Sequence, residues 1–195
     1  YINKKFNINK KLIKSIFLKE ILQRSFLSKL FNIDDYLSKY FEYKAMTNLE
    51  FKDLDILIGW SSFSYKSFLK AKNHKCISIL ERGSTHIEYQ NEILKREYEL
   101  LNLKPKLISK YLIDKEKKEY DLADYIMVPT EYAKKTFLDK GFSEEKIIKN
   151  YYGVDLKEFS FERQNKKKSS KFRIIYTGSV SVRKGVKYLL EALSE

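Results

Sequence analysis

From Leu54 onward, the sequence alternates between short apolar runs and longer amphipathic stretches. The apolar runs are rich in Ile, Leu and Val and several end at Gly or Pro, which is typical of buried strands. The stretches between them carry apolar residues at helical spacing. This alternation predicts βαβ units, and therefore an α/β fold with a parallel sheet and helices on both of its faces. The predicted strands are residues 54–59, 75–80, 125–128, 146–151 and 172–176; the predicted helices are residues 63–71, 87–103, 115–123, 131–140 and 184–193.

Two of these predictions have a local chemical reason. Thr130 stands directly before the predicted helix 131–140, where its hydroxyl can accept a free backbone N–H, and Gly141 is a typical helix stop. Cys76, the single cysteine, lies in an apolar run and has no His or Cys at metal-ligand spacing. We therefore expect Cys76 in the core. A lone cysteine also fits a reducing, cytosolic environment.

The amino-terminal part has a different pattern. Apolar residues between Ile8 and Phe31 recur at spacings of three to five, which predicts one long amphipathic helix or two joined ones. The pattern loosens through residues 32–53. The formal net charge is +13, with lysines concentrated in the first thirty residues and around residues 163–173. Such charge suits a polyanion, an anionic membrane surface or a ligand that carries phosphate. No apolar run has the roughly 20 residues that a bilayer span needs.

The domain organisation follows from one polar stretch. Residues 164–171 are charged and lack apolar residues, so we expect a linker there. The predicted division is a first domain over residues 1–155, a linker over 156–171 and the start of a second domain over 172–195. Because the chain begins with Tyr1 and ends at Glu195 within a predicted helix, we expect both ends to be truncated.

The loop from Gly178 to Gly185 has the features of a phosphate site. It joins a predicted strand to a predicted helix, and Gly178 lets the backbone turn close under a ligand. Arg183 and Lys184 add positive charge where free helix N–H groups already favour an anion. Neither a Walker A loop nor the dinucleotide-binding glycine pattern is present. The alternative interpretation is a solvated basic turn.

Three segments in order resemble family 4 of the retaining glycosyltransferases, which have the two-domain GT-B fold. The segment FRIIYTGSVSVRKGVKYLLEAL resembles the start of the second domain in that family. The segments IMVPTEYAKKTFLDKGFSEEKIIKNYYGVDLKEF and ILERGSTHIEYQNEILKREYEL resemble parts of the first domain. The three segments are residues 172–193, 126–159 and 79–100. The resemblance implies two Rossmann-like domains, the second represented only by its first βα unit.

The resemblance also implies roles for particular residues. In that family a basic pair at the first turn of the second domain holds the donor diphosphate, and its lysine matches Lys184. Its arginine is replaced by Ser179, so we expect Arg183 to supply the second charge or Ser179 to give only a hydrogen bond. The expected diphosphate site is Gly178, Ser179, Arg183 and Lys184, and the expected acceptor-side cleft is Arg82, Gly83, Ser84 and His86. The alternative for His86 is a position at a helix start without a role, and Ser84 or Thr85 can simply cap that helix.

The function implied is transfer of a sugar from a UDP- or GDP-type donor to a hydroxyl group, with retention of configuration, in polysaccharide or cell-envelope glycan synthesis. The family's acidic pair would lie beyond residue 195, so we expect this chain to be inactive alone. The resemblance implies no metal and no cofactor, a carbohydrate or lipid-linked acceptor, and a cytoplasmic location, with peripheral contact at the inner membrane face. The alternative function is a basic, non-catalytic module that docks on an anionic membrane or nucleic acid, although no nucleic-acid motif is present.

Overall fold

The computed structural model describes residues 9, 12–16, 34–157, 159 and 172–194. Its contacts divide the chain into two compact units. The first unit comprises Tyr1–Ile87 and Ser109–Asn150, and the second comprises Glu88–Ile108 and Tyr151–Glu195. Each unit is described below by itself. The predicted domain boundaries at residues 155 and 171 stay predictions.

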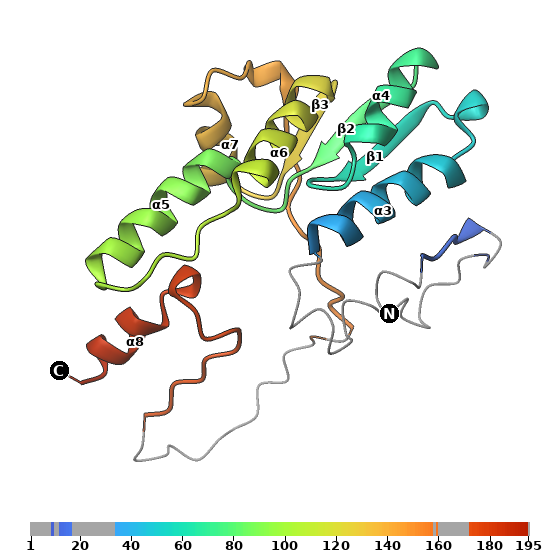
Figure 1. The fold of residues 1–195 in the computed structure, drawn as a ribbon. Helices are drawn as coiled ribbons and strands as arrows, with labels where there is room; N and C mark the ends of the chain where they lie inside the picture. Colours follow the sequence, from blue (N-terminus) through green and yellow to red (C-terminus); the bar gives the residue numbers. More distant parts are fainter. Residues whose placement is uncertain (1–8, 10–11, 17–33, 158, 160–171, 195) are drawn as a thin grey trace. The chain divides into compact units, whose positions relative to one another are not determined.

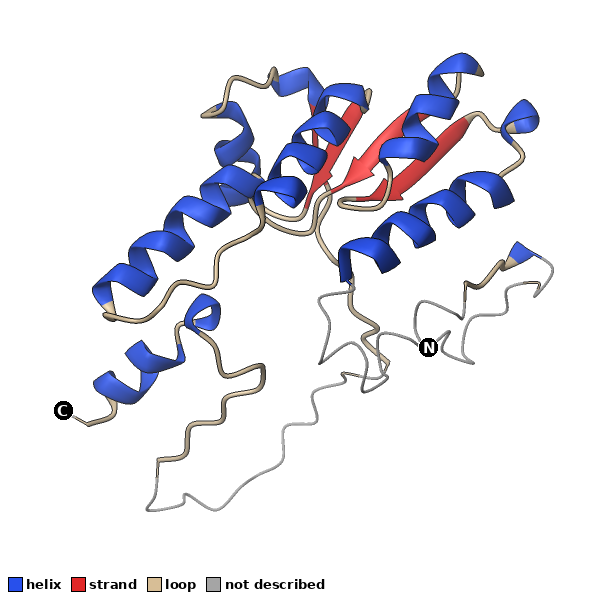
Figure 2. Ribbon diagram, in the orientation of Figure 1, coloured by secondary structure: helices blue, strands red, loops and turns tan. Residues whose placement is uncertain are grey.

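The first unit is built on a four-stranded parallel sheet (Figures 1 and 2). The order of the strands in the sheet is their order in the chain, so each strand pairs with the next. In register, Trp60 pairs with Glu81, and Glu81 pairs with Met127. The fold class predicted from the alternating pattern, α/β with a parallel sheet, is thereby confirmed. The strands are β1 (Ile56–Trp60), β2 (Ile77–Glu81), β3 (Tyr125–Val128) and β4 (Ile147–Lys149).

Four helices among the described residues of this unit pack on the sheet or on each other. They are α3 (Asp34–Asn48), α4 (Tyr65–Asn73), α6 (Lys110–Leu122) and α7 (Glu131–Leu138). Helix α4 contacts β1, β2, α3 and α6, and α7 contacts β4. Thr130 caps α7 as predicted, because its hydroxyl accepts the N–H of Ala133 at 3.0 Å. Gly141 follows with a φ of +87°, which confirms the predicted helix stop.

The sheet has one covered and one uncovered face in the part of the chain that is described. Along β1, β2 and β3, buried residues such as Leu57, Leu80 and Ile126 alternate with exposed or half-buried ones. The exposed side chains include Ile56, Ile58, Trp60, Ile77 and Tyr125.

The prediction of helices on both faces is therefore not met by the described helices of this unit. The strand order gives the physical reason. Right-handed crossovers between strands that succeed one another in a single direction place every connecting helix on the same face. Helices on both faces require the strand order to reverse at some point in the sheet, and no reversal occurs among the strands described.

The second unit contains helix α8 (Val186–Ala192) and all of helix α5 (Ile87–Leu100) except its first residue, which belongs to the first unit. The hydroxyl of Tyr188 donates to the Glu97 carboxylate at 2.6 Å, which joins the two helices. Residues 172–176 were predicted as a strand, but they have no strand partner among the described residues. An apolar run becomes a strand only when a neighbouring strand takes up its backbone hydrogen bonds.

Of the other predictions, one is confirmed, one helix was not predicted, and one predicted helix lies mostly among residues that the structure does not describe. Cys76 is buried, as expected for a core residue. Helix α3 lies in the stretch where the hydrophobic pattern loosens, so it was missed. The helix predicted between Ile8 and Phe31 falls mostly outside the described residues. Within the described part of the chain, no helix has the length and apolar character needed to cross a membrane.

Candidate functional site

The loops that follow β1 and β2 lie side by side at the carboxyl edge of the sheet. The N–H of Ser61 donates to the carbonyl of Glu81 at 3.0 Å, and the N–H of Arg82 donates to the carbonyl of Met127 at 2.8 Å. The sheet ladder thus continues one residue past each strand. In open parallel sheets this edge is where ligands bind. The candidate site is therefore residues 61–64 and 82–85.

Arg82 is held at the centre of this edge. Its Nε donates to the carbonyl of Thr85 at 3.1 Å and lies 3.4 Å from the Glu116 carboxylate. A second guanidinium nitrogen lies 3.5 Å from the hydroxyl oxygen of Ser61. The Arg82 side chain is only 11% exposed. A guanidinium fixed in this way has a defined orientation, as recognition of a carboxylate or phosphate requires.

Two acidic residues of α6 hold the loop after β1. Glu116 accepts hydrogen bonds from the hydroxyls of Ser62 and Tyr120. Glu119 accepts the backbone N–H groups of Ser62 at 2.7 Å, Ser64 at 2.8 Å and Tyr65 at 3.1 Å. These bonds satisfy N–H groups at the start of α4 that no helical carbonyl can reach. They also fix Ser62 at a φ of +76°, which a non-glycine residue adopts only when its surroundings impose it.

Burial raises the pKa of Glu119 from 4.5 to about 7. The N–H groups of Ser64 and Ser62 and the charge of Lys115 oppose this rise, while the charge of Glu116 adds to it. Desolvation outweighs these opposing effects because the side chain is completely buried. Glu119 is thus near the midpoint of its titration at neutral pH.

A glycine makes the close approach of this loop possible. A Cβ atom at Gly59 would lie 2.8 Å from the Cβ of Ser64 and 2.9 Å from a ring carbon of Phe68, and closer still to the Ser64 hydroxyl. The Ser64 hydroxyl itself donates to the carbonyl of Trp60 at 2.8 Å. The turn after β1 can fold back over the strand only because position 59 has no side chain.

The predicted acceptor-side residues take two different positions. Gly83 and Ser84 are half-buried beside Arg82 in the loop after β2. His86 is only 2% exposed, and its ring lies 5.1 Å from those of Tyr120 and Phe137. Its backbone N–H donates to the Thr136 hydroxyl at 2.9 Å. His86 therefore packs in an aromatic cluster under the loop, where the rings of Tyr120, Phe137 and Phe142 exclude water from its imidazole.

The predicted diphosphate residues lie together in the second unit. Gly178 and Gly185 have φ angles of +148° and +65°, and the Tyr176 hydroxyl donates to the carbonyl of Ser179 at 3.0 Å. Both Arg183 and Lys184 are in a short 3-10 turn, Val182–Lys184. Lys184 was expected at the amino terminus of the helix, but the left-handed conformation of Gly185 separates that turn from α8.

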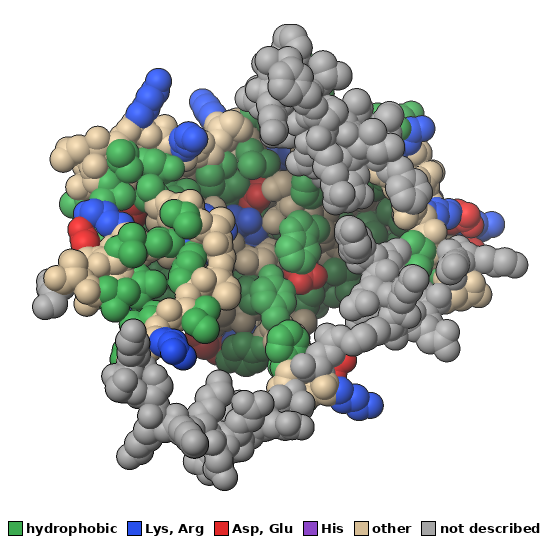
Figure 3. Space-filling view, turned by 90° about the horizontal axis from the view of Figure 1, so that it is seen from below, with side chains coloured by type: hydrophobic (Ala, Val, Ile, Leu, Met, Phe, Trp, Pro, Cys, Tyr) green, Lys and Arg blue, Asp and Glu red, His purple; other side chains and the backbone are tan. Residues whose placement is uncertain are grey.

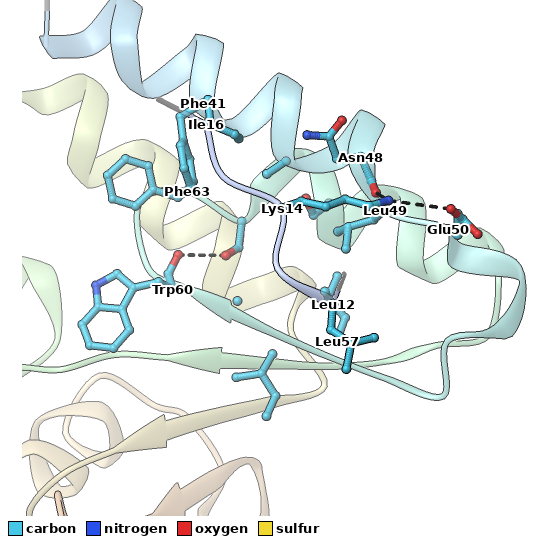
Figure 4. Close-up of a pocket in the computed structure, with 15 residues that line it drawn as sticks. Leu12, Lys14, Ile16, Phe41, Asn48, Leu49, Glu50, Leu57, Trp60 and Phe63 are labelled. Carbon is cyan, nitrogen blue, oxygen red and sulfur yellow. Dashed lines mark hydrogen bonds and ion pairs between the residues drawn. The ribbon is translucent and has the colours of Figure 1, made fainter. Parts of the chain in front are cut away.

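An apolar pocket of about 620 Å³ lies against β1 (Figure 4). Its wall combines Phe41 of α3 with Leu57 and Trp60 of β1 and with Phe63 from the loop after β1. Lys14 lies across it, donating from its ammonium to the carbonyl of Asn48 at 2.7 Å, and 3.7 Å from the Glu50 carboxylate. This pocket shares the loop after β1 with the candidate site.

No sequence pattern indicated a role for Glu116 or Glu119. They lie on a helix with many charged residues, where such side chains ordinarily face solvent, and their partners in the loop after β1 are more than fifty positions away in the chain. Among the residues that the structure describes, no group of His, Cys, Asp and Glu could hold a metal ion. Comparison with protein families, curated proteins and solved structures finds no significant match for the chain.

Proposed function

We propose that the protein is a glycosyltransferase of the GT-B type, which moves a sugar from a nucleotide-diphosphate-sugar donor to a hydroxyl group of a carbohydrate or lipid-linked acceptor. In this proposal the reaction retains the configuration of the sugar and serves the synthesis of polysaccharide or cell-envelope glycan at the cytoplasmic face of a membrane. The ordered resemblance over residues 79–193 motivates it. The parallel α/β sheet is compatible with it.

The observation that carries the proposal is the position of Arg82. Its guanidinium is fixed at the carboxyl edge beside the Ser61 hydroxyl and next to Gly83 and Ser84. A buried cation among hydroxyls and a small residue suits the binding of sugar hydroxyls and of a group with negative charge. Arg82 and Ser84 would orient the acceptor there. The buried position of His86 gives it a packing role beneath this loop.

The basic turn of the second unit has the donor role in this proposal. Cleavage of the bond between the sugar and the diphosphate leaves negative charge on the leaving group. Lys184 and Arg183 would stabilise that charge as it develops in the transition state. Gly178 and Gly185 shape the turn, since both have φ angles that residues with a side chain rarely adopt.

The test is a transfer assay with the natural protein, expressed in full from its own gene. It is incubated with UDP- and GDP-sugars and a lipid extract, and release of the nucleoside diphosphate and formation of a glycosylated product are followed by mass spectrometry. We expect release with one donor class only. Failure to release a nucleoside diphosphate from any donor, together with sedimentation on anionic vesicles, would favour the non-catalytic docking module instead.

A matched pair of variants probes the role of Arg82. Arg82→Lys keeps the charge beside Glu116 but loses the planar fork of donors. We expect it to raise the KM for the acceptor and to leave the KM for the donor unchanged. Arg96→Lys, on an exposed position of α5, is the control and should change neither constant. An equal rise in both KM values for Arg82→Lys would count against an acceptor-side role.

A further inference from the structure

The Glu116 carboxylate joins the two loops of the candidate site. The Ser62 hydroxyl donates to one oxygen of this carboxylate, and the Tyr120 hydroxyl donates to the other at 2.7 Å. The Nε of Arg82 lies 3.4 Å from that second oxygen. Several lysine and arginine side chains project from the surface in Figure 3, whereas the Arg82 side chain is only 11% exposed. One carboxylate therefore fixes a residue of the loop after β1 and a residue of the loop after β2.

The residues around this carboxylate differ in whether a ligand can reach them. Glu116 is 2% exposed and Tyr120 is completely buried. Ser62 is half-buried, so this residue keeps accessible surface. Glu116 can therefore act on a ligand only through the groups that it holds, whereas Ser62 can contact a ligand directly.

The hydrogen bond to Glu116 also prepares the Ser62 hydroxyl to accept another one. A serine hydroxyl has one hydrogen and two acceptor positions. Its hydrogen is engaged by Glu116, and its oxygen can accept a hydrogen bond from a second group. A hydroxyl that donates to a carboxylate is polarised, which makes its oxygen a stronger acceptor. Such an oxygen suits the hydroxyl group of a carbohydrate, which acts as the donor.

The backbone at Ser62 is strained. Its φ of +76° is a left-handed conformation that glycine adopts freely and that a residue with a side chain adopts only at a cost. A glycine here would remove the strain, but it would also remove the hydroxyl. The fold thus holds this hydroxyl in place although a glycine would fit the backbone better.

We propose that Ser62 is a further acceptor-binding residue, whose oxygen accepts a hydrogen bond from a carbohydrate hydroxyl of the acceptor beside Arg82. Glu116 is then a positioning residue, because it orients Ser62 and Arg82 without touching the acceptor. This inference rests on the proposed function, since it concerns the acceptor of that reaction. It deepens that function by assigning the loop after β1 to the acceptor as well.

The experiment compares Ser62→Ala with Ser62→Gly in the natural protein. Both variants lack the hydroxyl, but only the glycine also relieves the backbone strain. Transfer is measured at saturating donor over a dilution series of the lipid extract, which gives an apparent KM for the acceptor. We expect both variants to raise this KM by about three- to tenfold, the usual effect of losing one hydrogen bond, and to leave the KM for the donor unchanged.

Thermal unfolding separates a binding role from a structural one. Ser62→Gly should unfold at a higher temperature than Ser62→Ala, because it is free of the strain, although the two share the same acceptor KM. A normal KM in Ser62→Gly, with a raised KM in Ser62→Ala alone, would show that the hydroxyl is not needed and would overturn the proposal.

The matched controls are Ser143→Ala and Ser143→Gly. Ser143 is exposed, its φ is −70°, and its side chain forms no capping hydrogen bond. Neither control should change the acceptor KM. Here the glycine should be the less stable variant, because it relieves no strain and adds freedom to the unfolded chain.

Glu116→Gln tests the positioning role. It keeps the shape of the side chain but removes the charge that holds Arg82. We expect a larger rise in the acceptor KM than in either Ser62 variant, because both Ser62 and Arg82 lose their fixed orientation. In the double variant, Ser62→Ala should then add little. Fully additive effects in the folded double variant would overturn the positioning role. If circular dichroism shows that Glu116→Gln does not fold, the two Ser62 variants decide the proposal.

The same assay distinguishes this inference from the proposed function. Absence of transfer by the unaltered protein would contradict the proposed function, and this inference with it. Transfer by the unaltered protein, with an unchanged acceptor KM in both Ser62 variants, would overturn this inference alone.

Discussion

The Glu119 carboxylate accepts the backbone N–H of Ser64 at 2.8 Å, across 55 residues of chain. The same carboxylate accepts the N–H groups of Ser62 and Tyr65. One side chain of α6 therefore holds the whole turn between β1 and α4. The shape of the candidate site depends on a residue that never reaches its surface.

This contact makes stability depend on pH in a defined direction. Because burial raises the pKa of Glu119 from 4.5 to about 7, the folded state holds a proton between these values that the unfolded chain has released. The stability due to Glu119 is full below about pH 4.5 and is lost as the pH rises through 7. The shift corresponds to roughly 3 kcal/mol as an upper limit.

Glu119→Gln cannot ionise, so it should remove this fall in the free energy of unfolding. Urea denaturation at about pH 5 and about pH 8 measures the difference. The control is Glu131→Gln, which removes an exposed carboxylate whose pKa is lowered, chiefly by its hydrogen bond from Lys149. Glu131 titrates below the tested pH range, so in Glu131→Gln the free energy of unfolding should change with pH as much as in the unaltered protein. If the free energy of unfolding of Glu119→Gln still fell between about pH 5 and about pH 8, Glu119 would not be the group responsible.

Gly59→Ala should destabilise the first unit by about 1–3 kcal/mol, since the new Cβ would press against Ser64 and Phe68 within a packed core. Gly153→Ala is the control, because no heavy atom lies within 4 Å of a Cβ built there. Thermal unfolding followed by circular dichroism compares the two. Equal midpoints would show that the turn after β1 moves aside at little cost.

Thr130→Ala should cost about 1 kcal/mol of stability, because it removes the hydroxyl that accepts the N–H of Ala133 at the start of α7. Thr130→Ser keeps the hydroxyl and should recover most of the loss. Chemical denaturation of the two variants measures this difference. If Thr130→Ser were as unstable as Thr130→Ala, the methyl group and not the cap would be responsible.

Lys184→Ala should lower sugar transfer by the natural protein far more than Lys187→Ala. Lys184 lies in the turn between two glycines, whereas Lys187 lies on α8 and forms an ion pair with Glu191 at 2.8 Å. Losing a charge that stabilises the leaving diphosphate costs about 2–4 kcal/mol, or roughly thirty- to nearly a thousand-fold in rate. Lys184→Arg should recover part of it. Turnover at saturating acceptor measures all three, and equal losses in the two alanine variants would remove the donor role from this turn.

Local patterns were sufficient to predict the sheet and much of its surroundings. The run at residues 125–128, closed by Pro129, is strand β3 with the predicted bounds, and Thr130 caps the next helix. Helix α3 was not predicted because its buried side includes Glu42, which a hydrophobic pattern assigns to solvent. Residues 172–176 have the composition of a strand, but pairing depends on a neighbour that composition does not specify.

The sequence predicted where the candidate site lies, but not the residues of α6 that hold it in shape. Arg82 could be placed because it follows a strand, and the carboxyl ends of parallel strands share one edge. The carboxylate that holds it comes from Glu116, and the one that holds the neighbouring turn comes from Glu119. Both are charged side chains that become buried only once α6 lies over the loop. A sequence pattern records spacing along the chain, and these contacts join positions that only the folded chain brings together.

The succession of strands in chain order also affects how the first unit is assembled during synthesis. Domains generally begin to fold from the amino-terminal side as they leave the ribosome. Here Ile56 has already been synthesised when its partner Ile77 leaves the ribosome, and the same holds for Ile126 and its partner Ile147. No strand among the four has to wait for a later one to be inserted between it and its neighbour. The sheet can therefore grow at one edge, in step with translation.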